Sequence, residues 1–137
     1  MTIAAMANTI RTVVQALPSF TGATPIISLE FDNAPRLVTA TLDLWGRLTI
    51  EDGDTLQIEI AQNPQYRTIG VATIQLFAKK ELGDGGIRDL ADEIRDGVWR
   101  VKQSGVVFRI PSVRPLGVNG DWWQVNVIIP FRYTTAT

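Results

Sequence analysis

The sequence predicts an α+β fold in which two helices pack on one side of a mostly antiparallel β-sheet. Two segments carry apolar residues at helical spacing, and several others alternate apolar and polar residues as strands do. Asn119-Gly120 separates the last two strand-like segments, which is a strong hairpin signal. The chain has 137 residues, and we expect residues 1–137 to form a single domain, because no repeat or linker interrupts the pattern.

The first helix is predicted over residues 2–17. Its apolar residues recur every three or four positions and would share one helix face: Ile3, Met6, Ile10, Val13, Val14 and Leu17. Thr2 is a suitable N-cap, and Pro18 ends the pattern.

Strand-like segments follow from residue 26 onward. In the segment 44–50, the apolar Leu44, Leu48 and Ile50 share one strand face, whereas Trp45, Arg47 and Thr49 share the other. The acidic, glycine-containing segment 51–54 predicts a turn, and residues 55–60 alternate as a strand with one wet face. Residues 66–78 are apolar on both faces, so this strand is either central in a two-sided sheet or contains a bulge near Gly70.

The second helix begins after Asp84 and carries the apolar stripe Ile87, Leu90, Ala91, Ile94 and Val98. Its wet side holds Arg88, Asp89, Asp92, Glu93 and Arg95, and Gly97 is expected to close it. Residues 106–118 and 121–133 then form the two strands of the predicted hairpin.

The last strand raises a question about Trp122 and Trp123, since successive strand side chains point to opposite faces. The apolar face that includes Trp123 should meet the helices. The mixed face holds Trp122, Gln124, Asn126 and Ile128. Either a loop such as 30–44 covers Trp122, or a second subunit does, because aromatic residues are enriched at interface centres.

Composition excludes several function classes. Hydrophobic residues make up 45% and charged residues 20%, so disorder is not expected. The net charge is −1 with no basic block, which argues against a dedicated nucleic-acid binder. The chain has no cysteine and no histidine, which removes disulfides, triad catalysis and most zinc, copper and iron sites. No membrane span or secretory signal is found, so the default location is the cytoplasm of the producing cell.

Three groups were weighed as chemical sites. Glu51, Asp52 and Asp54 resemble the start of a calcium loop but lack its later ligands, and a solvated hairpin turn explains them better. The glycine-rich segment 83–86 could hold an anion at a helix start, although Asp84 would repel phosphate. The carboxylates of the second helix alternate with arginines as ordinary surface pairs do. We therefore expect no catalytic residue, no metal and no cofactor, and the default is not an enzyme.

Several ordered stretches resemble the tail terminator family of long-tailed bacteriophages, small proteins that close the head-proximal end of a tail tube. The resemblance covers about three-quarters of the chain, and its specificity lies in the order of the pieces: FDNAP (31–35), WGRLTI (45–50), QIEIAQNPQYRTIGVATIQLF (57–77), GIRDLADEIRD (86–96), GVVFRIPSV (105–113) and GDWWQVNVIIPFRY (120–133). The segment 36–44 departs from the family, where it is shorter and proline-rich, and could add a strand or an extended loop.

The resemblance implies a structural virion subunit that forms a hexameric ring on the last ring of the tail tube. Such a ring would end tube polymerisation and present a surface to the neck or head-completion proteins, while DNA passes through its lumen unread. The face with Trp122, Gln124, Asn126 and Ile128 is the candidate subunit interface. Arg67 and the acidic residues Glu51, Asp52 and Asp54 are secondary candidates for contacts with a neighbour or the tube. The alternatives are a neck or head-completion protein and a small anion-binding domain.

Overall fold

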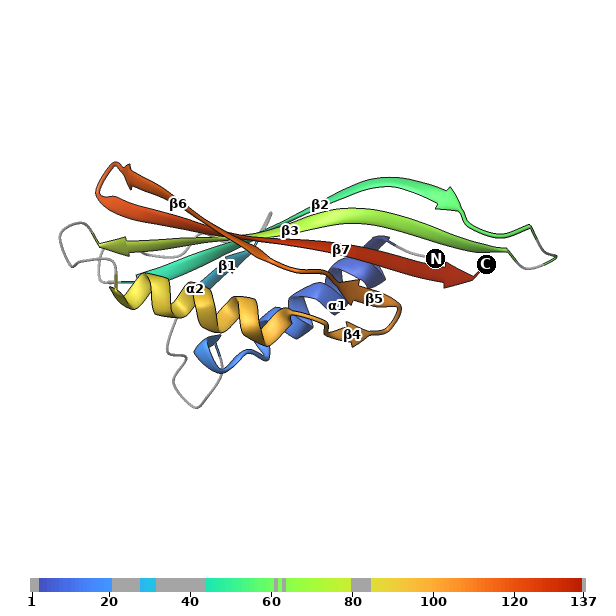
Figure 1. Cartoon of the computed structure of the whole chain (residues 1–137), viewed down its shortest axis with the longest axis horizontal. Coiled ribbons are helices and arrows are strands. Elements are labelled where there is room, and N and C mark those ends of the chain that lie inside the picture. Colours follow the sequence, from blue (N-terminus) through green and yellow to red (C-terminus); the bar gives the residue numbers. More distant parts are fainter. Residues whose placement is uncertain are drawn as a thin grey trace.

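The computed structural model describes residues 3–20, 28–31, 44–60, 62, 64–79 and 85–136 (Figure 1). Several sequence-based expectations lie outside these residues. They are the capping roles of Thr2 and Asp84, the strand start at 26–27 and the family-divergent segment up to residue 43. Residues 83 and 84 of the glycine-rich segment also lie outside.

The described residues form a seven-stranded, mostly antiparallel sheet, so the predicted α+β class is confirmed. Its main path runs β1 (Ser28–Phe31), β2 (Leu44–Gln57), β3 (Gln65–Lys79), β7 (Trp122–Ala136), β5 (Val106–Phe108) and β4 (Lys102–Gln103). The strand β6 (Ser112–Asn119) also pairs with β7. Only the β1–β2 pair is parallel among these strands.

The helices α1 (Ile3–Gln15) and α2 (Gly85–Val98) lie on one face of this sheet (Figure 1). A short 3-10 turn, η1 (Pro18–Phe20), follows α1 at the predicted proline. The predicted stripes are confirmed, because these side chains are buried: Met6, Ile10, Val13, Val14, Leu17, Ile87, Leu90, Ala91, Ile94 and Val98. The helices therefore form because each supplies one apolar face to the sheet.

Gly97 does not close α2, which corrects that prediction. The helix continues to Val98, and the left-handed residue after it is Arg100, with φ 67°. A Cβ on Gly97 would lie 2.7 Å from Cδ2 of Leu17. Gly97 thus permits close packing of α2 against the chain just after α1.

The segment 51–54 is not a turn, which corrects a second prediction. The strand β2 continues through it to Gln57, and its pairing with β3 shifts register between Asp52 and Thr55. The extra residue is a β-bulge, and it lies on β2, where residues 53 and 54 face Ile69, rather than on β3. Glycine and aspartate suit both a turn and a bulge, so only the pairing with β3 distinguishes the two. The strand β3 is central, between β2 and β7.

The hairpin at Asn119-Gly120 is confirmed, with Gly120 at φ 62°. However, residues 106–118 form two strands rather than one. Both β5 and β6 pair with the same edge of β7, and the chain between them stays close because Arg109 N donates to Pro130 O at 2.8 Å. The short β4 strand, which was not predicted, pairs with β5.

The three long strands extend beyond the helices. The strands β3 and β7 each have 15 residues and β2 has 14, or about 50 Å at 3.3 Å per residue. The helices have 13 and 14 residues and span about 20 Å. Residues 51–60 and 65–70, here called the β2–β3 arm, therefore project past the helical layer, at the right of Figure 1.

Candidate interaction surface

The sheet face opposite the helices, here called the open face, has no helix over it among the described residues (Figure 1). Strand alternation places Trp122, Gln124, Asn126 and Ile128 on this face, as predicted. The neighbouring register brings Trp45 of β2 opposite Phe77 of β3, and Phe77 opposite Gln124 of β7. Side chains from three strands therefore meet at one end of the open face.

An aromatic cluster occupies this end. The rings of Trp45 and Phe77 stack with centroids 4.4 Å apart and an interplanar angle of 18°. Trp122 meets Trp45 edge-on, at 5.9 Å and 85°. Both partners Trp45 and Phe77 are only 5% exposed, whereas Trp122 is half-buried. An aromatic ring of its own subunit thus covers part of Trp122, and the rest of the indole is accessible.

Arg47 and Glu30 complete the cluster. The guanidinium carbon of Arg47 lies 5.6 Å from the Trp45 ring centroid and 5.7 Å from that of Phe77, within the range of cation–π attraction. Its Nε lies 3.3 Å from Oε1 of Glu30, a buried carboxylate on β1. This ion pair links the short parallel strand β1 to β2 across the open face.

Two amide side chains lie next to the aromatic cluster on the open face of β7. Gln124 Nε2 donates to Asn126 Oδ1 at 2.9 Å, and Gln124 is buried while Asn126 and Ile128 are half-buried. Buried polar groups need such partners. The predicted interface residues therefore form one continuous row from an aromatic end to an apolar one.

The secondary candidates lie elsewhere, on the β2–β3 arm. Arg67 pairs in register with Leu56 and Thr134, and its Nε is buried without a partner among the described residues. Glu51 and Asp52 are exposed at the bulge. The structure separates these residues from the aromatic cluster, so the two candidate groups do not form one site.

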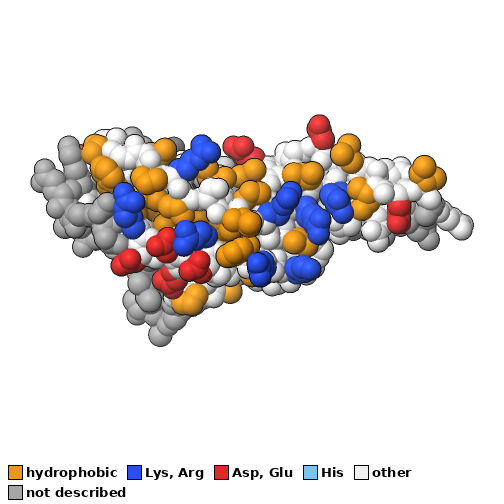
Figure 2. Space-filling view, viewed as in Figure 1, with side chains coloured by type: hydrophobic (Ala, Val, Ile, Leu, Met, Phe, Trp, Pro, Cys, Tyr) orange, Lys and Arg blue, Asp and Glu red, His pale blue; other side chains and the backbone are white. Residues whose placement is uncertain are grey.

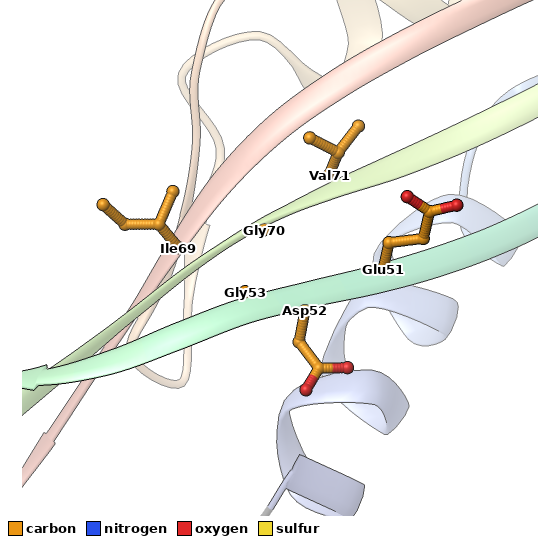
Figure 3. A pocket seen from close by; sticks show the side chains of 6 residues that line it. All are labelled: Glu51, Asp52, Gly53, Ile69, Gly70 and Val71. Carbon is orange, nitrogen blue, oxygen red and sulfur yellow. The ribbon is translucent and has the colours of Figure 1, made fainter.

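A shallow depression of about 300 Å³ lies at the bulge (Figure 3). Its lining consists of Glu51, Asp52, Gly53, Ile69, Gly70 and Val71. Glu51 and Asp52 point to opposite sides of β2 in Figure 3, so their carboxylates cannot share one cation. Among the residues that the structure describes, no three acidic side chains gather into a possible metal site.

Two glycines make this bulge possible. A Cβ on Gly53 would lie 2.7 Å from the carbonyl oxygen of Ile69. A Cβ on Gly70 would lie 2.5 Å from the carbonyl oxygen of Glu51 and 2.6 Å from Cζ of Phe131. The glycines thus serve close backbone pairing and the packing of a core ring.

The helix α2 presents its carboxylates to water. Arg95 lies 3.3 Å from Asp92 and 3.4 Å from Asp96, while Asp89 and Glu93 are exposed. These contacts are the surface pairs that the sequence predicted. They do not converge on a pocket.

Sequence reasoning missed the partners of Trp122. Trp45 and Arg47 were placed opposite the apolar face of their strand, but residues 66–78 were predicted as apolar on both faces and strand order was not predicted. The available signal was that Trp45 and Trp122 both fell on the less apolar face of a strand. Only the order β2–β3–β7 shows that they meet.

Comparisons with known proteins bear on the fold. No protein-family model matches the chain, and no curated protein matches it. One solved structure, which bears only a locus name, is similar with a TM-score of 0.63 and 17% sequence identity. The match covers 93% of this chain and 94% of the other. None of the described helices combines the length and the apolar character that crossing a bilayer requires. At this identity the likeness shows a shared α+β fold and nothing about activity.

Proposed function

We propose that this chain is a structural subunit of a phage tail terminator. In this role it forms a ring, with six members as in the family it resembles, on the head-proximal end of the tail tube. The ring ends tube polymerisation and joins the tube to the neck or head-completion proteins. The single observation that carries the proposal is the open face, where a half-buried tryptophan lies beside a row of amide and apolar groups.

The geometry of the open face suits a protein partner. Trp122 rests on a stacked aromatic pair and keeps part of its ring accessible. Interfaces concentrate binding energy on such aromatic anchors surrounded by polar groups. Gln124 and Asn126 hold each other in place, so the polar part of this surface is already organised. A second subunit over this face would complete the cover of Trp122.

The charge pattern agrees with a lumen that conducts DNA without reading it. The net charge is −1, and no run of basic residues offers a phosphate track. The resemblance to the terminator family supplies the partners, which are the tail-tube protein on one side and a neck protein on the other. The proposal includes no enzymatic step and no cofactor.

The proposed function is tested on tails assembled without the protein. We expect tubes of irregular length that fail to join heads, and restoration of normal tails when the protein is supplied. Tails of normal, fixed length in its absence would contradict the proposal. Labelled protein should bind tube ends, and binding to the portal side instead would assign it to the neck.

A further inference from the structure

The large hydrophobic side chains that are exposed fall into two groups. Four lie on the β2–β3 arm: Leu56, Ile58, Ile60 and Ile69. Four lie between the end of α2 and the hairpin: Trp99, Ile110, Leu116 and Val118. Ile60 is fully exposed at 101%. Contiguous exposed apolar side chains indicate interaction sites more strongly than single ones do.

The exposed charged side chains of each group have one sign. On the arm they are Glu51, Asp52, Asp54 and Glu59, whereas the arm's basic residue, Arg67, is half-buried. Residues 97–120 contain Arg100, Lys102, Arg109 and Arg114 and no Asp or Glu. All eight side chains are exposed, and none has an ion pair with another described residue. We call the second region the basic edge.

The two regions lie on opposite edges of the sheet. The arm belongs to β2 and β3, while the basic edge is formed by β4, β6 and the segments beside them. Between β2 and β6 lie β3 and β7, or three strand spacings of about 4.8 Å. In Figure 2 the far end of the arm shows hydrophobic and acidic side chains, and basic side chains gather between α2 and the arm. On β3, the arm is separated from β5 by β7 alone, because Ile69 and Val107 both pair with Arg132. The outer strand of the arm, β2, is therefore the part that lies farthest from the basic edge of its own chain.

Both edges have a free side. The strand β1 pairs with β2 only up to Leu48, so no described strand lies beside the arm on that side. The strand β6 pairs with β7 alone. Regular strand addition is limited by the bulge at Asp52 and by the irregular pairing between Pro115 and Gly117. Binding of a partner at either edge would therefore depend on side chains rather than on a long row of backbone hydrogen bonds.

We propose that the β2–β3 arm of one copy docks on the basic edge of the next copy, head to tail. Acidic groups then face basic ones, and the exposed isoleucines and leucines of the two regions bury each other. A two-fold symmetric contact through either region would place like charges together, which is unfavourable. Complementary but different surfaces generate a ring when the rotation closes. The inference rests on the proposed ring. It assigns Glu51, Asp52 and Asp54 to a contact with a neighbouring subunit rather than with the tube.

Charge reversal and mixing test the inference. One variant reverses the arm (Asp54→Lys with Glu59→Lys), and the other reverses the edge (Arg109→Glu with Arg114→Glu). Each variant alone would oppose like charges, so we expect its association in low salt to weaken at least about tenfold, or 1.4 kcal/mol. A 1:1 mixture restores complementary contacts around an alternating ring and should recover the wild-type mass. Sedimentation and native mass spectrometry across concentration measure both effects.

The control matched to the arm variant is Asp89→Lys with Glu93→Lys on α2, which makes the same change in charge outside both regions. It should leave association unchanged, and circular dichroism should show every variant folded. The inference is overturned if either variant associates like wild type or if the folded variants remain separate when mixed. A wild-type chain that stays monomeric at every concentration in low salt also overturns it. Tail length is a separate measurement. Tails of normal length without the protein would reject the terminator function, but they would not contradict the recovery of association in the mixed variants.

Discussion

The two faces of β7 have different environments although they belong to one strand. Val125, Val127, Ile129 and Phe131 are 0% exposed against the helices. Of the alternating positions on the open face, Trp122, Asn126 and Ile128 are half-buried and Gln124 is buried. Burial of apolar area is the main favourable term in folding, so the helix-covered face determines the fold. The open face contributes less, and it is the face that we propose for a partner.

The same comparison explains the aromatic cluster. On the covered face, each apolar side chain is enclosed by α1, α2 and the neighbouring strands. On the open face, Trp45 and Phe77 stack on each other beneath Arg47 and beside Trp122. Among the described residues, these contacts between strand side chains take the place that the helices have on the covered face. The substitutions below test this difference, in order of expected effect on stability.

Phe131→Ala should cause the largest loss. The ring is fully buried on the covered face and fills the space above Gly70. Its removal leaves a cavity, and we expect the free energy of unfolding to fall by about 3–5 kcal/mol. Urea denaturation followed by circular dichroism measures the change. A loss below 1 kcal/mol would show that the covered face does not dominate stability.

Gly70→Ala should destabilise the protein by about 2 kcal/mol, because its Cβ would overlap Phe131 and the backbone of Glu51. Gly86→Ala is the matched control, since nothing lies within 4 Å of its Cβ in α2. Alanine favours helix over glycine, so this change should stabilise by up to about 1 kcal/mol. Equal effects of the two substitutions would contradict the close approach at the bulge.

Arg47→Ala should cost about 1–2 kcal/mol. It removes the ion pair of the buried Glu30 carboxylate and the cation over two rings. Arg47→Lys retains the charge but loses the planar group and should recover part of the loss. Denaturation curves of both variants, compared with Glu30→Gln, test the contact. No loss in Arg47→Ala would mean that the open face is stable without it.

Trp122→Ala should have the smallest effect on the monomer, about 1 kcal/mol from the lost edge contact with Trp45. It should nevertheless weaken subunit association, measured by sedimentation. Trp123→Ala provides the comparison, because Trp123 packs against the core cluster and its loss should cost about 2 kcal/mol of stability. Unchanged association in Trp122→Ala would remove the open face from the interface.

Much of the fold follows from periodicity in the sequence. The stripes of α1 and α2 and the alternation in β7 predicted which side chains are buried, and Asn119-Gly120 predicted the hairpin. The errors occur where local signals are ambiguous. Glycine and aspartate at 51–54 suit a turn as well as a bulge, and the break between β5 and β6 depends on pairing with β7. The placement of Trp122 on the mixed face was predictable, but its contact with Trp45 was not.

The sequence alone determined the faces of each helix and strand, because side-chain direction follows from backbone periodicity. It also excluded thiol and imidazole chemistry, because cysteine and histidine are missing. Tertiary structure alone decided the strand order, and with it which outward side chains meet. It likewise decided that the acidic arm and the basic edge lie on opposite sides of the sheet. Strand order depends on contacts between residues far apart in the chain, and no local pattern encodes those contacts.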